Sequence, residues 1–234
     1  MSNDLFEIAK NELYNVEEMK DISENPIIKT ALSLVKWFPG VGTFLTSTIS
    51  SELQMFQNSK REKIEKILFE DDSITLDDVK DIRFIMEYIN LMEVVDRLSE
   101  NTKVEYLGKL FKNTVLSSEK DKYDIFKERM NKLNELSNRE IEVMYYLYES
   151  QYNITAEPFG THGNETPDDK KLRIWETFLQ FAKNHGYSNE DAEAIIAGAS
   201  RTGFCKIKYL NVKSKTKIIY LLTNEYFRLI DQIK

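Results

Sequence analysis

Residues 205–222 read CKIKYLNVKSKTKIIYLL, and this stretch decides the fold of the C-terminal part of the chain. Apolar and polar residues alternate over 205–210, and a second run rich in β-branched and aromatic residues covers 215–222. The polar residues 211–214 between the two runs are typical of a turn. The stretch therefore predicts a two-stranded β-hairpin.

Helix-start signals lie on both sides of the predicted hairpin. They are Ser137 with Glu140, Thr166 before Pro167-Asp168-Asp169, Ser188 with Asp191, and Thr223. A loop is expected over residues 151–166, and Gly186 is expected to end the second of these helices. Three helices, a hairpin and a closing helix follow the order of a winged-helix unit, so we expect residues 136–234 to form a winged-helix-like domain.

The preceding residues 1–135 predict an all-helical domain, and the whole chain is predicted to be mainly α. Only 8 Gly and 4 Pro occur among 234 residues, which favours long helices. Helical periodicity is expected over residues 3–20, after Pro26, and over 75–98, 102–116 and 119–134. The residues expected to face inward on the 75–98 helix are Val79, Ile82, Ile85, Ile89, Met92 and Val95.

Residues 27–49 are the most apolar part of the chain and lie within the segment 27–55, which Pro39-Gly40-Val41-Gly42 divides into two halves. Each half spans about 10–12 residues, short of the ~20 that a membrane-crossing helix needs. The segment is interpreted as a helical hairpin in the domain core. Association with a membrane surface is the alternative that the sequence leaves open.

Charge is unevenly distributed along the chain. The net charge is −7, yet residues 198–234 contain eight Lys or Arg against two Asp or Glu, a local charge of +6. An acidic body with a basic C-terminal end is suited to local contact with a polyanion. The single cysteine, Cys205, and the acidic N-terminal sequence without a signal-peptide pattern predict a cytoplasmic protein.

The sequence offers little that would support catalysis or a cofactor. His162 is expected in a loop near Glu165 and Asp168, His185 is expected as a cation at a helix end, and Cys205 is expected to be half-buried. Neither a nucleotide-binding fingerprint nor a Ser/His/Asp order appears. We therefore expect a non-enzymatic protein without a cofactor or a bound metal.

Nucleic-acid contact is predicted through the hairpin. The candidate contacts are Lys206, Lys208, Lys213, Lys215, Lys217 and Arg201. Lys206 and Lys208 should share one face of their strand, as should Lys215 and Lys217. The alternative is that these lysines only deter strand addition at an exposed edge. The third helix begins Asn189-Glu190-Asp191-Ala192-Glu193, and such an acidic start would repel phosphate from the position that a winged helix usually places in the major groove.

A second candidate contact is a tyrosine patch on the helix that starts at Ser137. Its members are Tyr145, Tyr146, Tyr148 and Tyr152. Tyrosines are enriched at protein interfaces, so an exposed patch would indicate a protein partner or a homo-oligomer. The alternative is that these tyrosines belong to the core and to ordinary surface.

The chain also carries a family resemblance, loosely over residues 30–150. It rests on the glycine-broken apolar hairpin leading into QNSKREKIEK (57–66), on YLGKLF (106–111), YDIF (123–126) and LNELSNREIEVM (133–144), and on the C-terminal Leu-Thr helix cap. These patterns resemble the abortive-infection alpha group of bacterial phage-resistance-associated proteins. The resemblance implies a bacterial or prophage protein that acts through macromolecular contacts in phage defence, and it implies no catalytic residues. A winged-helix DNA-binding regulator and a membrane-associating effector that uses residues 27–55 are the alternatives.

Overall fold

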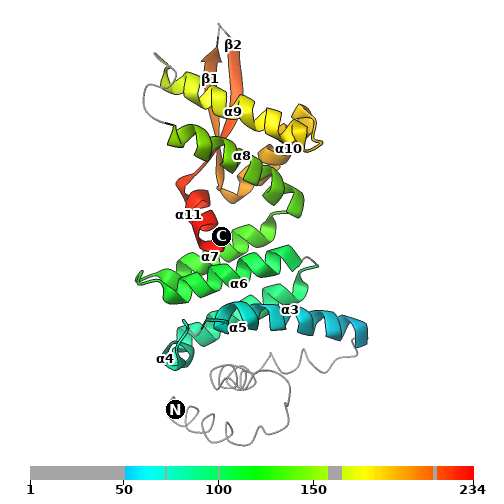
Figure 1. Cartoon of the computed structure of the whole chain (residues 1–234), viewed down its shortest axis with the longest axis vertical. Coiled ribbons are helices and arrows are strands. Elements are labelled where there is room, and N and C mark those ends of the chain that lie inside the picture. The colour runs from blue at the N-terminus through cyan, green and yellow to red at the C-terminus, as the bar shows by residue number, and fades with distance from the viewer. Residues whose placement is uncertain (1–50, 72, 100, 158–164, 213–214) are drawn as a thin grey trace, which may run out of the picture. The chain divides into compact units, whose positions relative to one another are not determined.

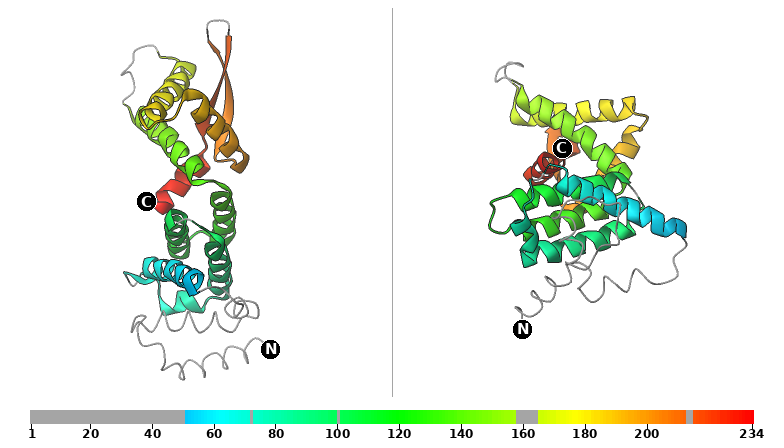
Figure 2. Two further views of the ribbon diagram at one scale, coloured as in Figure 1. Left: turned by 90° about the vertical axis from the view of Figure 1, so that its right-hand side faces the viewer. Right: turned by 60° about the horizontal axis from the view of Figure 1, so that its bottom comes forward.

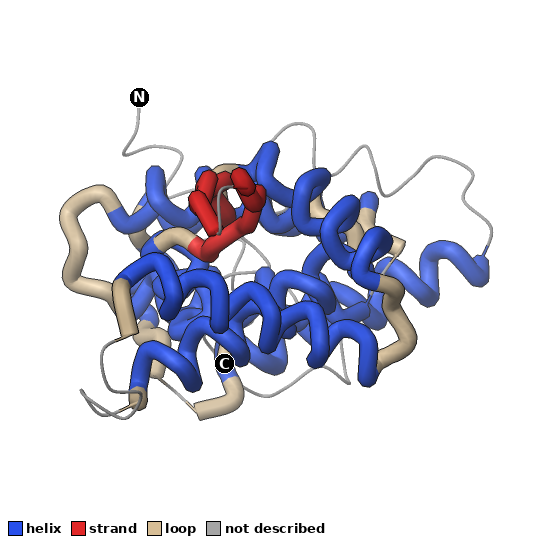
Figure 3. The backbone as a smooth tube through the Cα atoms, turned by 90° about the horizontal axis from the view of Figure 1, so that it is seen from above, coloured by secondary structure: helices blue, strands red, loops and turns tan. Residues whose placement is uncertain are grey.

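The computed structural model describes residues 51–71, 73–99, 101–157, 165–212 and 215–234. Over these ranges the chain is mainly helical with one two-stranded antiparallel hairpin near its C-terminus, as predicted (Figures 1 and 3). Several predictions fall outside the described residues: the helices at 3–20 and after Pro26, residues 27–50 of the apolar segment, His162 and Lys213.

The chain divides into two compact units, residues 1–131 with Ile233 and residues 132–232 with Lys234. The described helices of the first unit are α3 (Ser51–Phe69), α4 (Leu76–Lys80), α5 (Ile82–Arg97), α6 (Asn101–Leu116) and most of α7 (Lys122–Glu135).

The single helix predicted over residues 75–98 is in fact two helices, because Asp81 interrupts it. Thr75 starts α4 with a capping box to Asp78. The backbone of Asp81 is extended, and its carboxylate accepts a hydrogen bond from the Arg83 N–H (2.9 Å), which starts α5. The break exposes Ile82, which was wrongly predicted to face inward. The other predicted inward residues are buried or half-buried: Val79, Ile85, Ile89, Met92 and Val95.

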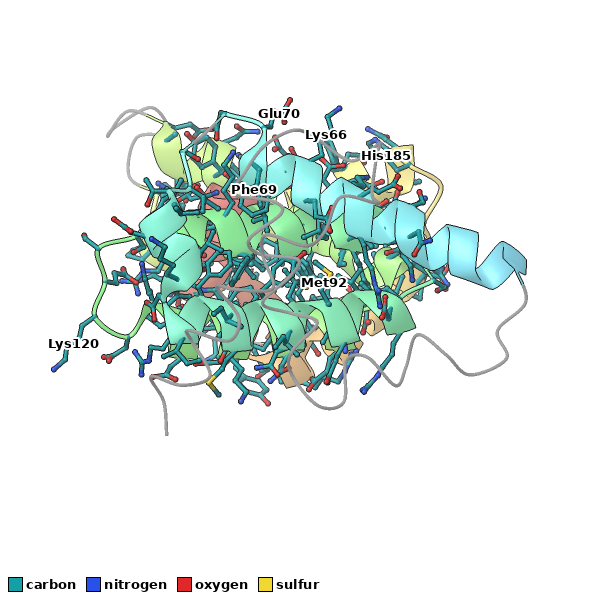
Figure 4. The ribbon with its side chains drawn as sticks, turned by 90° about the horizontal axis from the view of Figure 1, so that it is seen from below. Lys66, Phe69, Glu70, Met92, Lys120 and His185 are labelled. Atoms are coloured by element: carbon teal, nitrogen blue, oxygen red, sulfur yellow. The ribbon has the colours of Figure 1, made fainter. Side chains whose placement is uncertain are left out.

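Aromatic side chains fill the centre of the first unit. The ring centroid of Phe111 lies 5.2 Å from that of Phe84 and 5.0 Å from that of Phe126. The three residues come from α6, α5 and α7, so the cluster joins three helices. Figure 4 shows Met92 among the side chains of the interior, where it is buried, whereas Lys120 projects outward.

Helix α3 is fixed to both α5 and α6. The buried Lys60 ammonium donates to the carbonyls of Val95 and Leu98, each at 2.8 Å, at the C-terminal end of α5. The Val95 carbonyl also accepts the Leu98 N–H (3.2 Å), so Lys60 adds a second donor at this helix end, where carbonyls lack their full set of intrahelical partners. Gly108 of α6 faces α3, and a Cβ at Gly108 would lie 3.0 Å from a terminal methyl of Ile64.

The second unit contains α8 (Asn138–Ala156), α9 (Pro167–Asn184), α10 (Asn189–Ala199), the 3-10 turn η2 (Ser200–Thr202), β1 (Cys205–Val212), β2 (Lys215–Leu222) and α11 (Asn224–Ile233). The predicted start signals are confirmed for α8, α9 and α10, where Ser137, Thr166 and Ser188 each accept a helix N–H. Gly186 follows α9 with φ +90°, as a helix-ending glycine does. Thr223 precedes α11 as predicted, but its hydroxyl donates to the carbonyls of Gly203 and Phe204 instead of capping the helix.

Helix α8 is longer than predicted, since it continues through residues 151–156 of the expected loop. Ser150 does not end it, because the Ser150 hydroxyl donates back to the Tyr146 carbonyl (2.9 Å) inside the helix. Gln151 in the added turn pairs with the backbone of Leu222 at the end of β2. Its side-chain oxygen accepts from the Leu222 N–H (2.9 Å), and its amide donates to the Leu222 carbonyl (3.3 Å). The last turns of α8 therefore hold the base of the hairpin.

Candidate nucleic-acid interface

The pairing register of the hairpin places its described lysines on one face. Lys206 lies opposite Leu221, Lys208 opposite Ile219, Leu210 opposite Lys217, and Val212 opposite Lys215. Directly opposed residues of an antiparallel pair share a face, and alternate residues along a strand share it too. The predicted pairs Lys206/Lys208 and Lys215/Lys217 therefore belong to the same face, which we call the lysine face and which comprises these eight residues.

The lysine face is half buried and half solvated. Its apolar members Leu210, Ile219 and Leu221 are buried against the unit, while Lys206 and Lys208 on β1 are exposed. On β2, Lys215 is exposed, whereas Lys217 is half-buried and pairs with Glu176 of α9 at 3.3 Å. Three exposed ammonium groups therefore flank the buried residues. The charge of the fourth is partly neutralised, because its nearest ion-pair partner is a carboxylate of the same unit.

The hairpin projects past the helices of its own unit (Figures 1 and 2). Its other face, which we call the Tyr209 face, consists of the remaining residues of both strands. Tyr209 and Ile218 lie directly opposite each other there and are 68% and 51% exposed. Ile207 is exposed as well, whereas its partner Tyr220 is half-buried with its ring centroid 5.7 Å from that of Trp175. Both faces of the hairpin contain apolar residues, so the alternation of side chains alone does not predict which face is buried.

Arg201 is engaged within the protein. Its guanidinium forms a two-pronged ion pair with Glu140 and donates to the carbonyls of Gly198 (2.6 Å) and Glu135 (2.5 Å). The hydrogen bonds from Arg201 hold the pKa of Glu140 down at about 2. Glu140 also closes the capping box of α8 with Ser137. Arg201 was predicted as a nucleic-acid contact, but the structure places it in a contact that joins the end of α10 to the start of α8.

Helix α10 presents an acidic and exposed start. Glu190, Asp191 and Glu193 are all exposed, and the Asp191 carboxylate accepts a hydrogen bond from the Ser188 hydroxyl (2.8 Å). The helix occupies the third position of the unit, from which a winged helix usually reads base edges. Carboxylates at that position would oppose the approach of phosphates.

The predicted tyrosine patch is not a single surface, because its members lie on two sides of α8. Tyr145, Tyr148 and Tyr152 form a ladder of rings with successive centroids 5.8 Å and 5.6 Å apart. Tyr148 in the middle is buried, and Lys234 donates to its hydroxyl (2.8 Å). Tyr146 is buried on another side of the helix. The prediction of four exposed tyrosines is therefore wrong for Tyr146 and Tyr148, and it leaves Tyr145 and Tyr152 exposed.

A polar cluster around Glu142 was not foreseen from the sequence. The Glu142 carboxylate accepts hydrogen bonds from the hydroxyls of Tyr146 and Tyr187, and these bonds lower the pKa of the carboxyl. The His185 ring stacks on Tyr146 with centroids 4.5 Å apart, and its Nδ1 lies 2.8 Å from the Phe181 carbonyl. His185 thus lies at the end of α9 as predicted, but it is fixed between aromatic rings. The tyrosines at 146 and 187 are too far apart in sequence for their shared carboxylate to have been predicted.

Nothing among the described residues assembles into a recognised catalytic or metal site. Cys205 is buried rather than half-buried, and burial raises the pKa of its thiol to about 12, so the thiol stays protonated at neutral pH. In the described ranges no three His, Cys, Asp or Glu side chains gather in a way that would hold a metal ion. Over the same residues, no helix combines the length and the apolar character needed to cross a bilayer.

No protein-family model, curated protein or solved structure matches this chain. The resemblance to the abortive-infection alpha group therefore rests on the sequence patterns quoted above.

Proposed function

We propose that this protein is a non-enzymatic cytoplasmic protein that acts through macromolecular contacts, with the β1–β2 hairpin as a wing that binds the phosphate backbone of nucleic acid. One observation carries the proposal. The register of the hairpin gathers Lys206, Lys208, Lys215 and Lys217 on one face, and three of the four ammonium groups are exposed. Phosphate contacts by lysine are the main source of affinity in binding that does not depend on sequence.

The charge of the rest of the unit supports a restricted form of this binding. The exposed carboxylates of α10 disfavour insertion of that helix into a major groove. Arg201 contributes no free cation there, because Glu140 neutralises it. Binding through the wing alone should therefore be weak, sensitive to salt and largely independent of base sequence.

The test is fluorescence anisotropy of a labelled DNA of random sequence at low salt. The variant Lys206→Gln/Lys208→Gln/Lys215→Gln removes the three exposed charges of the lysine face. A charge-matched control is Lys120→Gln/Lys127→Gln/Lys183→Gln, which removes three exposed lysines outside the hairpin. We expect the wing variant to lose most of the binding and the control to keep it. Equal losses in the two variants would show that net charge, and not the wing, determines binding.

The biological setting that we propose is bacterial phage defence. Its support is the resemblance carried by residues 57–66 and 106–144. A phage challenge of cells with and without the gene tests this setting. Protection that is lost in the wing variant and kept in the charge-matched control would connect the setting to the hairpin, and identical plaque counts with and without the gene would reject it.

A further inference from the structure

The Tyr209 face is apolar, exposed and formed by residues paired across the two strands. Tyr209 and Ile218 are opposite one another, and Ile207 continues the surface along β1. Lysines alone suffice for phosphate contact or for the protection of a strand edge. Neither role explains why an exposed tyrosine lies opposite an exposed isoleucine. Exposed apolar residues gathered in one place usually mark a surface that another molecule covers.

The molecule that covers this face could be a second copy of the protein or a nucleic-acid strand, and the charge of the hairpin distinguishes between the two. The hairpin sequence 205–222 contains five lysines and no acidic residue. A second copy packed on the Tyr209 face would bring two such hairpins together, and their like charges would repel. A nucleic-acid strand has the opposite charge, and it also carries flat apolar surfaces in its bases. Aromatic side chains beside a positively charged surface are the usual platform for unpaired bases.

We propose that the Tyr209 face stacks on unpaired bases, so that the hairpin prefers single-stranded nucleic acid or open duplex ends to a continuous duplex. The inference rests on the proposed function, in which the lysine face holds the phosphates. The two faces belong to the same two-stranded ribbon, so a strand that passes along its edge presents phosphates to Lys206 and Lys208 and turns its bases toward Tyr209. In a continuous duplex the bases are stacked inside, and Tyr209 has no base face to contact.

The experiment compares two DNA probes of equal nucleotide concentration at low salt. One is a labelled single strand without self-complementarity, and the other is a relaxed covalently closed circular duplex, used as competitor, which has no ends. The variants are Tyr209→Ala and the conservative Tyr209→Phe, and the control is Tyr152→Ala, which removes an exposed tyrosine outside the hairpin.

We expect the single strand to bind more tightly than the circle. We expect Tyr209→Ala to weaken binding of the single strand by about 5- to 150-fold, the range found for loss of one stacked base. Binding of the circle should not change, and Tyr209→Phe and Tyr152→Ala should behave as the wild type. Because Tyr209 is largely exposed, its truncation should leave the circular dichroism spectrum unchanged.

Three results would overturn the inference, and they can be told apart. In the first, both probes bind with equal affinity, Tyr209→Ala has no effect, and the triple lysine variant loses binding. This result rejects base stacking and leaves the proposed function standing. Absence of binding to either probe by the wild type rejects the proposed function and the inference with it. A dimer in sedimentation analysis that Tyr209→Ala dissociates, with DNA binding unchanged, assigns the face to a second copy.

Discussion

The ion pair between Arg201 and Glu140 should make the second unit sensitive to acid. The perturbation is Glu140→Gln, which keeps the shape of the side chain and removes its charge. The pKa of Glu140 falls from 4.5 to about 2 in the folded protein, chiefly through the hydrogen bonds from Arg201. At about 1.4 kcal/mol per pH unit the shift would amount to at most ~3 kcal/mol. Because the Arg201 side chain is 44% exposed, solvent screening reduces this to about 1–2 kcal/mol.

The sign of the pH dependence follows from the lowered pKa. The stabilisation is fully present above pH 4.5, where the carboxyl is ionised in both the folded and the unfolded states. It is lost as the pH falls from about 4.5 to about 2. Glu140→Gln should therefore lower the free energy of unfolding by about 1–2 kcal/mol at pH 7, and this deficit should shrink at pH 3.

The assay is urea unfolding followed by tryptophan fluorescence. The chain has two tryptophans, so a Trp37→Phe background leaves Trp175, which is buried in the second unit, as the reporter. Glu193→Gln is the control, because Glu193 is exposed on α10 and its loss should cost less than about 0.5 kcal/mol. A double-mutant cycle with Arg201→Gln should give a coupling energy of about 1–2 kcal/mol at pH 7. A coupling energy near zero, or a deficit that is the same at pH 7 and pH 3, would refute the reasoning.

The remaining predictions concern the stability of each unit. Lys60→Met should destabilise the first unit by about 1–3 kcal/mol in thermal unfolding, since it removes the buried hydrogen bonds that the ammonium donates to the Val95 and Leu98 carbonyls at the end of α5; a change under about 0.5 kcal/mol would contradict the capping role. Gly108→Leu should cost about 1–3 kcal/mol, because α3 already lies against this position, and an unchanged melting temperature would show that the helices separate freely. Arg173 binds both Glu157 and Glu165 through pairs of hydrogen bonds, so Arg173→Gln should cost about 1 kcal/mol at low salt. The deficit of Arg173→Gln should narrow in 1 M NaCl, which screens the repulsion between the two carboxylates; a deficit independent of salt would contradict this explanation.

Local signals in the sequence predicted most of the element boundaries. Ser137, Thr166 and Ser188 each start a helix in the structure, and Gly186 ends one. Such caps depend on residues three positions apart, so a short stretch of sequence contains everything that determines them. The hairpin could be predicted for the same reason, because the alternation of apolar and polar residues and a polar turn are local properties of the sequence.

Features that depend on distant residues were not predictable in this way. Asp81 breaks a helix whose apolar periodicity continues on both sides, and only its extended backbone shows that it caps α5. Lys60 is a charged residue in a charged run, yet it is buried against carbonyls more than thirty residues away. Arg201 was predicted as a free cation because Glu140, its partner, lies 61 positions earlier in the chain.

In the candidate site, too, the features that depend on local sequence were predictable, and those that depend on tertiary packing were not. The pairing of Lys206 with Lys208 and of Lys215 with Lys217 on one face of each strand followed from the alternation of side chains along a strand. That the two pairs lie on the same face of the hairpin depends on the strand register, which the structure shows. The exposure of Tyr209 did not follow from the alternation, because both faces of the hairpin carry apolar residues and only packing against the helices decides which face is buried. The pairing of Lys217 with Glu176 likewise depends on where α9 passes β2.

The most direct test of the proposed phosphate contacts is the salt dependence of DNA binding. Each phosphate contact made by a lysine contributes about 0.7–0.9 to the slope of log affinity against log salt concentration. The wild type should show a steep negative slope, and Lys206→Gln/Lys208→Gln/Lys215→Gln should reduce its magnitude by about 2–3, while Lys120→Gln/Lys127→Gln/Lys183→Gln leaves it unchanged. A wild-type slope near zero, or a slope that the wing variant does not alter, would contradict the account.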